Sequence, residues 1–396
     1  MKFSLKRIGA TGILLGVVAG PVAVLAAPQA GAIPPVAHPK QDLESAGSDT
    51  IYWVTKAIDT QYNTNGNAIN SDKDHAGPIP PVNIAPFPTS YTTVGDAHCA
   101  KQTFNSSSAA TTPPNGSSAG IGALVADAGK GCIDYARSSR GTKAGDPANI
   151  DFWAFGLDAL GVGRFQGAGN PKASNVPANL TQQQIIQIYT CNPATGAPYI
   201  SDWHQVNAAA PKGSLIKKFS PQTSSGSYSF FNSQILNGTT VDAGCNSSHL
   251  TTFIEEHDAA EVPTAAKPNA IFPMSYAQWV ADRNKKTPDL RNGIVEMSIN
   301  GIAPSAKTIN TVDGAGHFIG TRYVYNVTMP TQPDYTDVLR LVGADNSGAG
   351  FICSGAEKSI ITAFGFQPLA AATTGTTSSG TNVTLKSACR VNPTPV

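Results

Sequence analysis

The stretch Asn115–Ile121, with the sequence NGSSAGI, places two hydroxyl side chains, Ser117 and Ser118, and two glycines directly before an apolar segment. Leu124 and Val125 continue that segment at helical spacing, so the stretch should form the turn that opens a helix. Such a turn can aim side-chain O–H and backbone N–H groups at one anion, because the N-terminus of a helix attracts negative charge. The stretch therefore predicts an anion-binding turn.

Three further hydroxyl-rich turns occur, at Ser48–Thr50, Ser138–Ser139 and Ser224–Ser227. The last of them also precedes an apolar segment. One such turn alone is an ordinary capped helix. Four of them favour a shared site, because ligands of open α/β sheets lie at the carboxyl ends of strands, where helices begin. The turns at 115–121 and 224–227 are expected to hold one small ligand from two sides.

Charged residues that could bind the anion lie close to these turns. Arg137 and Arg140 are spaced closely enough for a guanidinium to pair with a tetrahedral anion, although a surface ion pair is the alternative. Asp49 could accept the proton of hydrogen phosphate and so select it over sulfate. A plain helix N-cap is the alternative role of Asp49.

A serine hydrolase is a second possibility, because Gly116–Gly120 satisfies the G-x-S-x-G pattern with Ser118 as its nucleophile. That motif needs a buried strand directly before it, whereas residues 106–114 contain almost nothing apolar. The pattern is short and matches often by chance. The candidate bases would be His204, His257 and His317.

No metal or cofactor is expected from residue spacing. The acidic stretch Glu255–Asp258, with the sequence EEHD, lacks the H-E-x-x-H arrangement. The chain contains no C-x-x-C pair, and no histidine stands at ligand spacing from two cysteines.

Residues 1–32 have the pattern of a secretory signal peptide. Positive charges at Lys2, Lys6 and Arg7 precede the apolar run Ile13–Leu25, and Ala30–Ala32 forms an A-x-A cleavage site. The run is too short to span a membrane comfortably, and no cysteine follows it to carry a lipid anchor. A secreted, soluble protein is expected, with a disordered lead-in over residues 33–44.

The composition argues against a polyanion-binding surface. The formal net charge is +1, and the leader carries three positive charges, which leaves −2 for the mature chain. Only 13 % of the residues are charged. A nucleic-acid partner is therefore not expected.

Six cysteines in an exported chain favour three disulfides. Fifteen pairings are possible in principle. Sequential pairing is favoured, because each pair then lies within one local segment: Cys99–Cys132, Cys191–Cys245 and Cys353–Cys389.

Hydrophobic spacing predicts strands that alternate with helices, which is typical of an α/β chain. Helices are expected to begin near residues 51, 117, 181, 230 and 359. Strands are expected at residues 132–136, 152–160, 216–219, 270–274 and 323–327.

The order and spacing of these turns resemble the phosphate-type substrate-binding proteins of ABC transporters, most closely an actinobacterial secreted branch. The resemblance covers roughly residues 45–280. It implies a type 2 periplasmic-binding-protein fold of two α/β lobes, with a hinge and an interlobe ligand cleft. The first lobe would be formed by residues 45–165 and 286–396, and the second by residues 166–285.

The resemblance further implies a monomeric, non-enzymatic protein that binds a small anionic solute, phosphate first, for an ABC permease. Two family positions differ: the family arginine is Pro221 here, and the family aspartate is Ser139. A surface protein that kept the fold and lost its ligand is a third hypothesis. The predicted ligand-binding residues are Asp49, Thr50, Ser117, Ser118, Arg137, Ser139, Arg140, Ser225, Gly226 and Ser227.

Overall fold

The computed structural model describes residues 42–64, 70–71, 90–92, 99, 102–105, 112–166, 174–191, 198–309, 316–345, 348–370, 374–383, 385 and 388–394. The expected signal peptide and residues 33–41 of the lead-in lie outside this part of the chain. Asp42–Leu43 form strand β1, and Leu43 packs into the hydrophobic core. The expectation that disorder extends to residue 44 was therefore wrong, because this end of the segment buries an apolar side chain.

The described chain is mixed α/β, as predicted. Its helices are α1 (Tyr52–Thr64), α2 (Ser117–Ala126), α3 (Gln182–Tyr189), α4 (Gly226–Phe230), α5 (Tyr276–Arg283), α6 (Tyr335–Val342), α7 (Phe351–Ser354) and α8 (Lys358–Ala363). Short helical turns are η2 (Trp203–Gln205), η3 (Phe231–Ile235), η4 (Ser247–His249), η5 (Ala259–Glu261) and η6 (Lys267–Asn269).

The longer strands are β2 (Ser45–Gly47), β4 (Ser90–Thr92), β5 (Thr103–Asn105), β6 (Tyr135–Ser138), β7 (Asp151–Phe165), β9 (Lys217–Pro221), β10 (Thr252–Ile254), β11 (Ala270–Ser275), β12 (Ile294–Glu296) and β14 (Thr321–Thr328). The two-residue strands besides β1 are β3 (Asn70–Ser71), β8 (Asn179–Leu180), β13 (Ser298–Ile299), β15 (Ala344–Asp345), β16 (Gly348–Ala349), β17 (Gln367–Pro368), β18 (Gly375–Thr376), β19 (Asn382–Val383) and β20 (Arg390–Val391).

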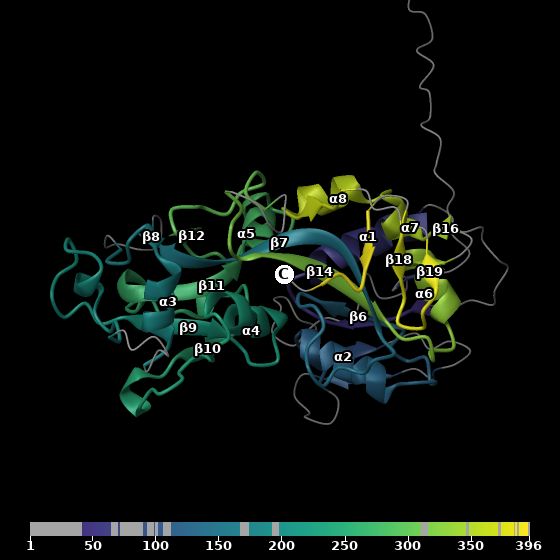
Figure 1. Ribbon diagram of the computed structural model, residues 1–396, viewed down its shortest axis with the longest axis horizontal. Helices are drawn as coiled ribbons and strands as arrows, with labels where there is room; N and C mark the ends of the chain where they lie inside the picture. The colour runs from purple at the N-terminus through teal and green to yellow at the C-terminus, as the bar shows by residue number, and fades with distance from the viewer. Residues whose placement is uncertain are drawn as a thin grey trace, which may run out of the picture. The chain divides into compact units, whose positions relative to one another are not determined.

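Strand β7 organises the largest sheet of the described residues, whose main path is β10-β9-β11-β7-β14-β6-β2. Its first part, Asp151–Ala159, pairs antiparallel with β14, and its last part, Leu160–Phe165, pairs with β11 and β12. Figure 1 shows β7 running from the strands near α2 to the strands near α3. Nearly all of its side chains are buried, as expected for a strand covered on both faces.

Separate hydrophobic clusters lie along the two parts of β7. Trp153 and Phe155 from the first part pack with α1, α6 and α8. Leu160 and Val162 from the last part pack with α3 and η3. The strand therefore links two regions that each have their own core.

The carboxyl ends of two parallel strand pairs carry the predicted turns. β2 pairs in parallel with β6, and β9 pairs in parallel with β10. Strand β6 begins at Tyr135, later than predicted, because the N–H groups of Cys132 and Ile133 donate to Asp127 Oδ2 instead of to a neighbouring strand. The predicted helix start at Thr181 is confirmed, with a full capping box to Gln184.

The sequential disulfide pairing is confirmed: Cys99 bonds Cys132, Cys191 bonds Cys245, and Cys353 bonds Cys389. None of the helices in the described part of the chain has the length and apolar character that crossing a membrane requires.

Glu357, at the start of α8, is fully buried, and neither carboxylate oxygen has a hydrogen-bond partner among the described residues. Burial raises the pKa of this carboxyl to about 8. The folded protein therefore favours the neutral acid, whereas the unfolded chain ionises near the ordinary value. This difference stabilises the fold most below pH 4.5, and the contribution is lost as the pH rises towards 8.

We expect Glu357→Gln to stabilise the protein increasingly as the pH rises from 5 to 8, because the variant has no charge to bury. The gain should amount to a few kcal/mol, since each unit of pKa shift corresponds to about 1.4 kcal/mol. Urea denaturation at several pH values measures it. The control is Asp289→Asn, a half-exposed carboxylate paired with Arg291. An equal, pH-independent effect of both variants would contradict this account.

Candidate functional site

Four strand ends supply the candidate site. The first two loops follow β2 and β6, and the other two follow β9 and β10. The residues that these loops contribute are Asp49 and Thr50, then Ser139 and Arg140, then Ser225–Ser227, and finally Glu256 and His257. This arrangement is the one expected for ligand sites at the carboxyl ends of parallel strands.

The two serine-glycine turns, far apart in the sequence, touch each other. The N–H of Ser118 donates to the carbonyl of Ser224 at 3.3 Å. Gly116 has a φ of 89°, and a Cβ atom on it would lie 2.6 Å from the same carbonyl oxygen. The glycine therefore permits both the left-handed backbone and the close approach of the second turn.

Ser117, Ser139 and Gly226 form a buried group at this contact. Ser117 Oγ lies 3.3 Å from Ser139 Oγ and accepts a hydrogen bond from the Ser139 N–H at 2.9 Å. A Cβ atom on Gly226 would collide with Ser117 Oγ and would lie 2.5 Å from Ser139 Oγ. Only glycine fits at this position while both hydroxyls stay in place.

The Glu256 carboxylate accepts hydrogen bonds from two of the predicted anion donors. Thr50 Oγ1 donates to Glu256 Oε1 at 2.7 Å, and Ser225 Oγ donates to Glu256 Oε2. Ser225 also caps α4, since its Oγ accepts from the N–H groups of Ser227 and Tyr228. The hydroxyls that the sequence marked as oxyanion donors thus hold an oxyanion that belongs to the chain itself.

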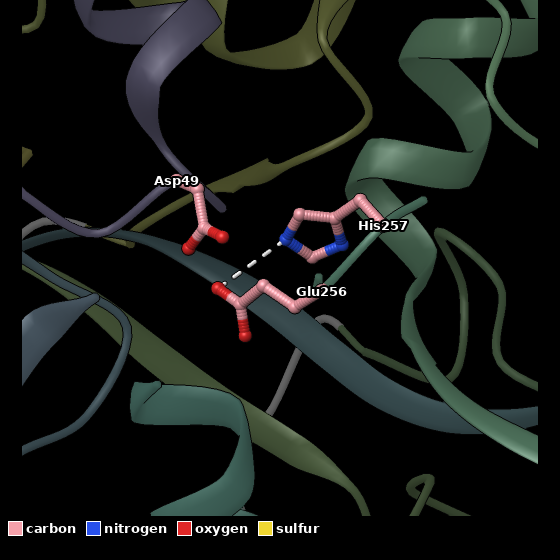
Figure 2. Close-up of side chains that lie close together, drawn as sticks. All are labelled: Asp49, Glu256 and His257. Carbon is pink, nitrogen blue, oxygen red and sulfur yellow. Dashed lines mark ion pairs between the residues drawn. The ribbon is translucent and has the colours of Figure 1, made fainter. Parts of the chain in front are cut away.

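Asp49, Glu256 and His257 point toward one another (Figure 2). Their side-chain ligand atoms lie within 4.8 Å of one another, and the three residues are 2 %, 3 % and 5 % exposed. His257 Nε2 lies 3.4 Å from Glu256 Oε1 and 3.2 Å from Thr50 Oγ1. His257 also has a φ of 72°, a strained value for this residue type that is common at functional sites.

The two acids of this cluster have opposite pKa shifts. Burial, followed by the negative charge of Glu256, raises the pKa of Asp49 well above its ordinary value. Burial alone would raise the pKa of Glu256 too, but the neighbouring Asp49 and His257 outweigh it and hold that pKa well below the ordinary range. The two shifts favour a single negative charge on the pair, held by Glu256, with the proton on Asp49.

A buried arginine that sequence reasoning missed lies behind the site. Arg322 in β14 donates from Nη1 to Ser227 Oγ at 2.8 Å. It also pairs with Asp158, whose Oδ2 accepts from Nη2 at 2.8 Å and from Nε at 3.1 Å. Nothing in the local sequence marked Arg322, because it lies within a strand, between Thr321 and Tyr323, and apart from the hydroxyl-rich turns.

The two predicted arginines bind protein acceptors. Arg137 donates to the carbonyls of Ser45 and Ser48, and its guanidinium lies over the Tyr52 ring. Arg140 forms a two-bond pair with Asp146 at 2.7 and 3.0 Å. Their contact with a ligand stays a prediction.

The contacts of Ser118 do not favour the hydrolase. Its Oγ accepts from Arg140 Nε at 3.2 Å and from Lys143 Nζ at 3.0 Å. No histidine of the described chain is among its hydrogen-bond partners, so a base that could take its proton is not in place.

No protein-family model matches the chain, and neither does any curated protein. Solved structures do match. A protein from Clostridium perfringens, described as a phosphate ABC transporter substrate-binding protein with bound phosphate, is 15 % identical with a TM-score of 0.50, and the match covers 83 % of this chain and 99 % of that one. The chain has the fold of a periplasmic binding protein.

An ABC-type phosphate transport receptor from Vibrio cholerae is 14 % identical over 82 % of this chain and 99 % of that chain, with a TM-score of 0.48. PstS from Borrelia burgdorferi is 17 % identical over 83 % of this chain and 98 % of that chain, with a TM-score of 0.42. At such identities the likeness concerns the fold, and the actinobacterial branch stays a prediction.

We expect Gly226→Ala to destabilise the protein by about 1–3 kcal/mol, because the added methyl group collides with the hydroxyls of Ser117 and Ser139. The matched control is Gly122→Ala in α2. A Cβ atom there meets nothing within 4 Å, and alanine favours a helix. Urea denaturation compares the two variants. Equal stabilities would show that the close packing around Gly226 is not required.

Proposed function

We propose that this protein is a secreted, non-enzymatic substrate-binding protein that captures a small oxyanion, with phosphate as the first candidate, for uptake by an ABC permease. The observation that carries the proposal is the Glu256 carboxylate held by the hydroxyls of Thr50 and Ser225. A group of donors that accommodates a buried carboxylate has the geometry and polarity needed for another oxyanion.

In this proposal the ligand displaces the Glu256 side chain and takes over its donors. Further O–H groups are directed by their neighbours. Ser227 Oγ accepts a hydrogen bond from Arg322, and Ser117 Oγ accepts one from the N–H of Ser139. A hydroxyl whose oxygen is already an acceptor can still donate its own proton, so both side chains can bind an anion.

The charges of the site suit an anion that carries a proton. Arg322 supplies a buried positive charge one residue away from the ligand, through Ser227. Asp49, whose pKa is raised by burial, carries an O–H group that can donate to the ligand instead of repelling it. These two residues would replace the family charges that are missing at Pro221 and Ser139.

The site joins the two predicted lobes. Thr50 belongs to residues 45–165 and Ser225 to residues 166–285, and both bind Glu256. Strands β7 and β14 link the two regions. We propose that the lobes move about these strands and close on the ligand, as in hinged binding proteins. The C. perfringens protein of this fold, which was solved with phosphate, supports that ligand as the first to test.

A ligand-free surface protein is the second candidate. The observation that favours it is again Glu256, since a side chain that permanently fills the donors leaves no place for a solute. The two candidates differ in whether Glu256 can be displaced.

We expect the mature chain to bind phosphate in calorimetric titration after treatment with a chelator. Removing the competing carboxylate with Glu256→Ala should strengthen the binding by about tenfold or more, which corresponds to about 1.4 kcal/mol. Ser225→Ala should weaken it, because the variant loses one hydroxyl donor. The control is Ser229→Ala, one turn further along α4.

Thermal denaturation of each variant shows whether it is folded, since Ser225 is also a helix cap. If neither the wild type nor Glu256→Ala gives heat or a thermal shift with millimolar phosphate or sulfate, the oxyanion proposal is wrong and the ligand-free protein is favoured. Labelling of Ser118 by a fluorophosphonate would instead support the serine hydrolase hypothesis.

A further inference from the structure

The side chains of Asp49 and His257 are not explained by the hydroxyl donors that hold Glu256. Both lie beside the Glu256 carboxylate, and they come from two different loops (Figure 2). The three residues together offer one imidazole nitrogen and two carboxylates, with ligand atoms no more than 4.8 Å apart. Such a set has the composition of a metal site as well as that of an acid cluster.

Two buried atoms of this cluster lack partners among the described residues. Asp49 Oδ2 and His257 Nδ1 are shielded from solvent, and neither has a hydrogen bond. Leaving a buried polar atom unpaired costs about 1–3 kcal/mol, so native proteins usually satisfy it with a group, a water or an ion. Asp49 Oδ2 lies on the carboxylate that faces Glu256 and His257 in Figure 2.

A small cavity adjoins the three side chains. Its volume is about 20 Å³. A space of about 10–15 Å³ holds one water molecule, so this cavity can take a single ion with a water but not an organic solute. Four of the eight residues that line it are the acids Asp49, Glu255, Glu256 and Asp258, which favours a cation.

We propose that Asp49, Glu256 and His257 bind one divalent transition-metal cation, with Zn²⁺ as the first candidate. Imidazole together with carboxylate suits such cations, whereas Ca²⁺ takes six to eight oxygen ligands. Zinc lies about 2.0–2.2 Å from such atoms, so two of its ligand atoms are at most about 4.4 Å apart. The ligand atoms of the three residues lie within 4.8 Å of one another, and small side-chain rotations would bring them to the separation that zinc requires.

Neighbouring hydroxyl groups already orient Glu256, one of the three proposed metal ligands. Thr50 Oγ1 and Ser225 Oγ each donate to a different oxygen of Glu256, which fixes the plane of its carboxylate. Hydrogen bonds of this kind are a regular feature around metal ligands. On binding the cation, Asp49 would release its proton, so that two carboxylates balance the two charges, and a water in the cavity would complete the coordination. The cation would join the loop after β2 to the loop after β10.

This inference does not rest on the proposed oxyanion function, although the two ligands would compete, because the cation needs the carboxylates of Asp49 and Glu256 and the oxyanion displaces Glu256. It is tested with the metal alone, whereas the oxyanion is tested with phosphate on chelator-treated protein. Either proposal can therefore be refuted without refuting the other.

We expect the mature chain, freed of metal by EDTA, to bind one equivalent of Zn²⁺ in calorimetric titration, with a Kd of about 1 µM or tighter. Zn²⁺ should also raise the melting temperature in a concentration-dependent manner. Asp49→Asn and His257→Gln should each weaken the binding by at least about tenfold, since each removes one ligand. His249→Gln is the control, because this residue contacts Tyr199 outside the cluster.

The proposal is overturned if the wild type takes up neither Zn²⁺ nor Mn²⁺, or if His257→Gln binds as tightly as the wild type. If a variant fails to fold, anomalous scattering at the zinc edge from crystals of the wild type decides the matter. A peak between Asp49, Glu256 and His257 supports the site, and a peak elsewhere on the chain, or no peak, refutes it.

Discussion

The Glu256 carboxylate, held by the hydroxyls of Thr50 and Ser225, is the interaction on which the arrangement of the site depends. A buried carboxylate is costly unless it is hydrogen-bonded and balanced by charge. Here two hydroxyls satisfy its oxygens, while Asp49 and His257 favour its ionised form. The same contacts connect the loops after β2, β9 and β10. One anion therefore explains why hydroxyl-rich turns from distant segments converge.

Strand β7 makes this convergence possible. Its two parts pair with different strands and border different cores, and β14 accompanies the first part over its whole length. Arg322 on β14 reaches Ser227 on the far side of the site while it is paired with Asp158 on β7. The strands that link the two regions therefore also place the positive charge of Arg322 next to Ser227. In the proposed function, a small movement along these strands would change the positions of the hydroxyl donors around Glu256.

Local chemistry made much of this architecture predictable. Turn glycines, caps such as Thr181, and the sequential cysteine pairs are encoded within a few tens of residues, and these predictions are confirmed. The residues that complete the site are not encoded locally. Glu256 meets Thr50 across 206 residues, and Arg322 meets Ser227 across 95. In the sequence the EEHD stretch is distinguished only by its acidic residues, because no spacing pattern connects it with its partner Asp49.

The central claim is that the donors around Glu256 form an exchangeable oxyanion site. A crystal structure of Glu256→Ala grown in phosphate tests it most directly. The account predicts a tetrahedral anion bound by Thr50 and Ser225, with Ser117 and Ser227 close enough to donate to it. Density for water alone, or another side chain of the protein in that place, would contradict the claim.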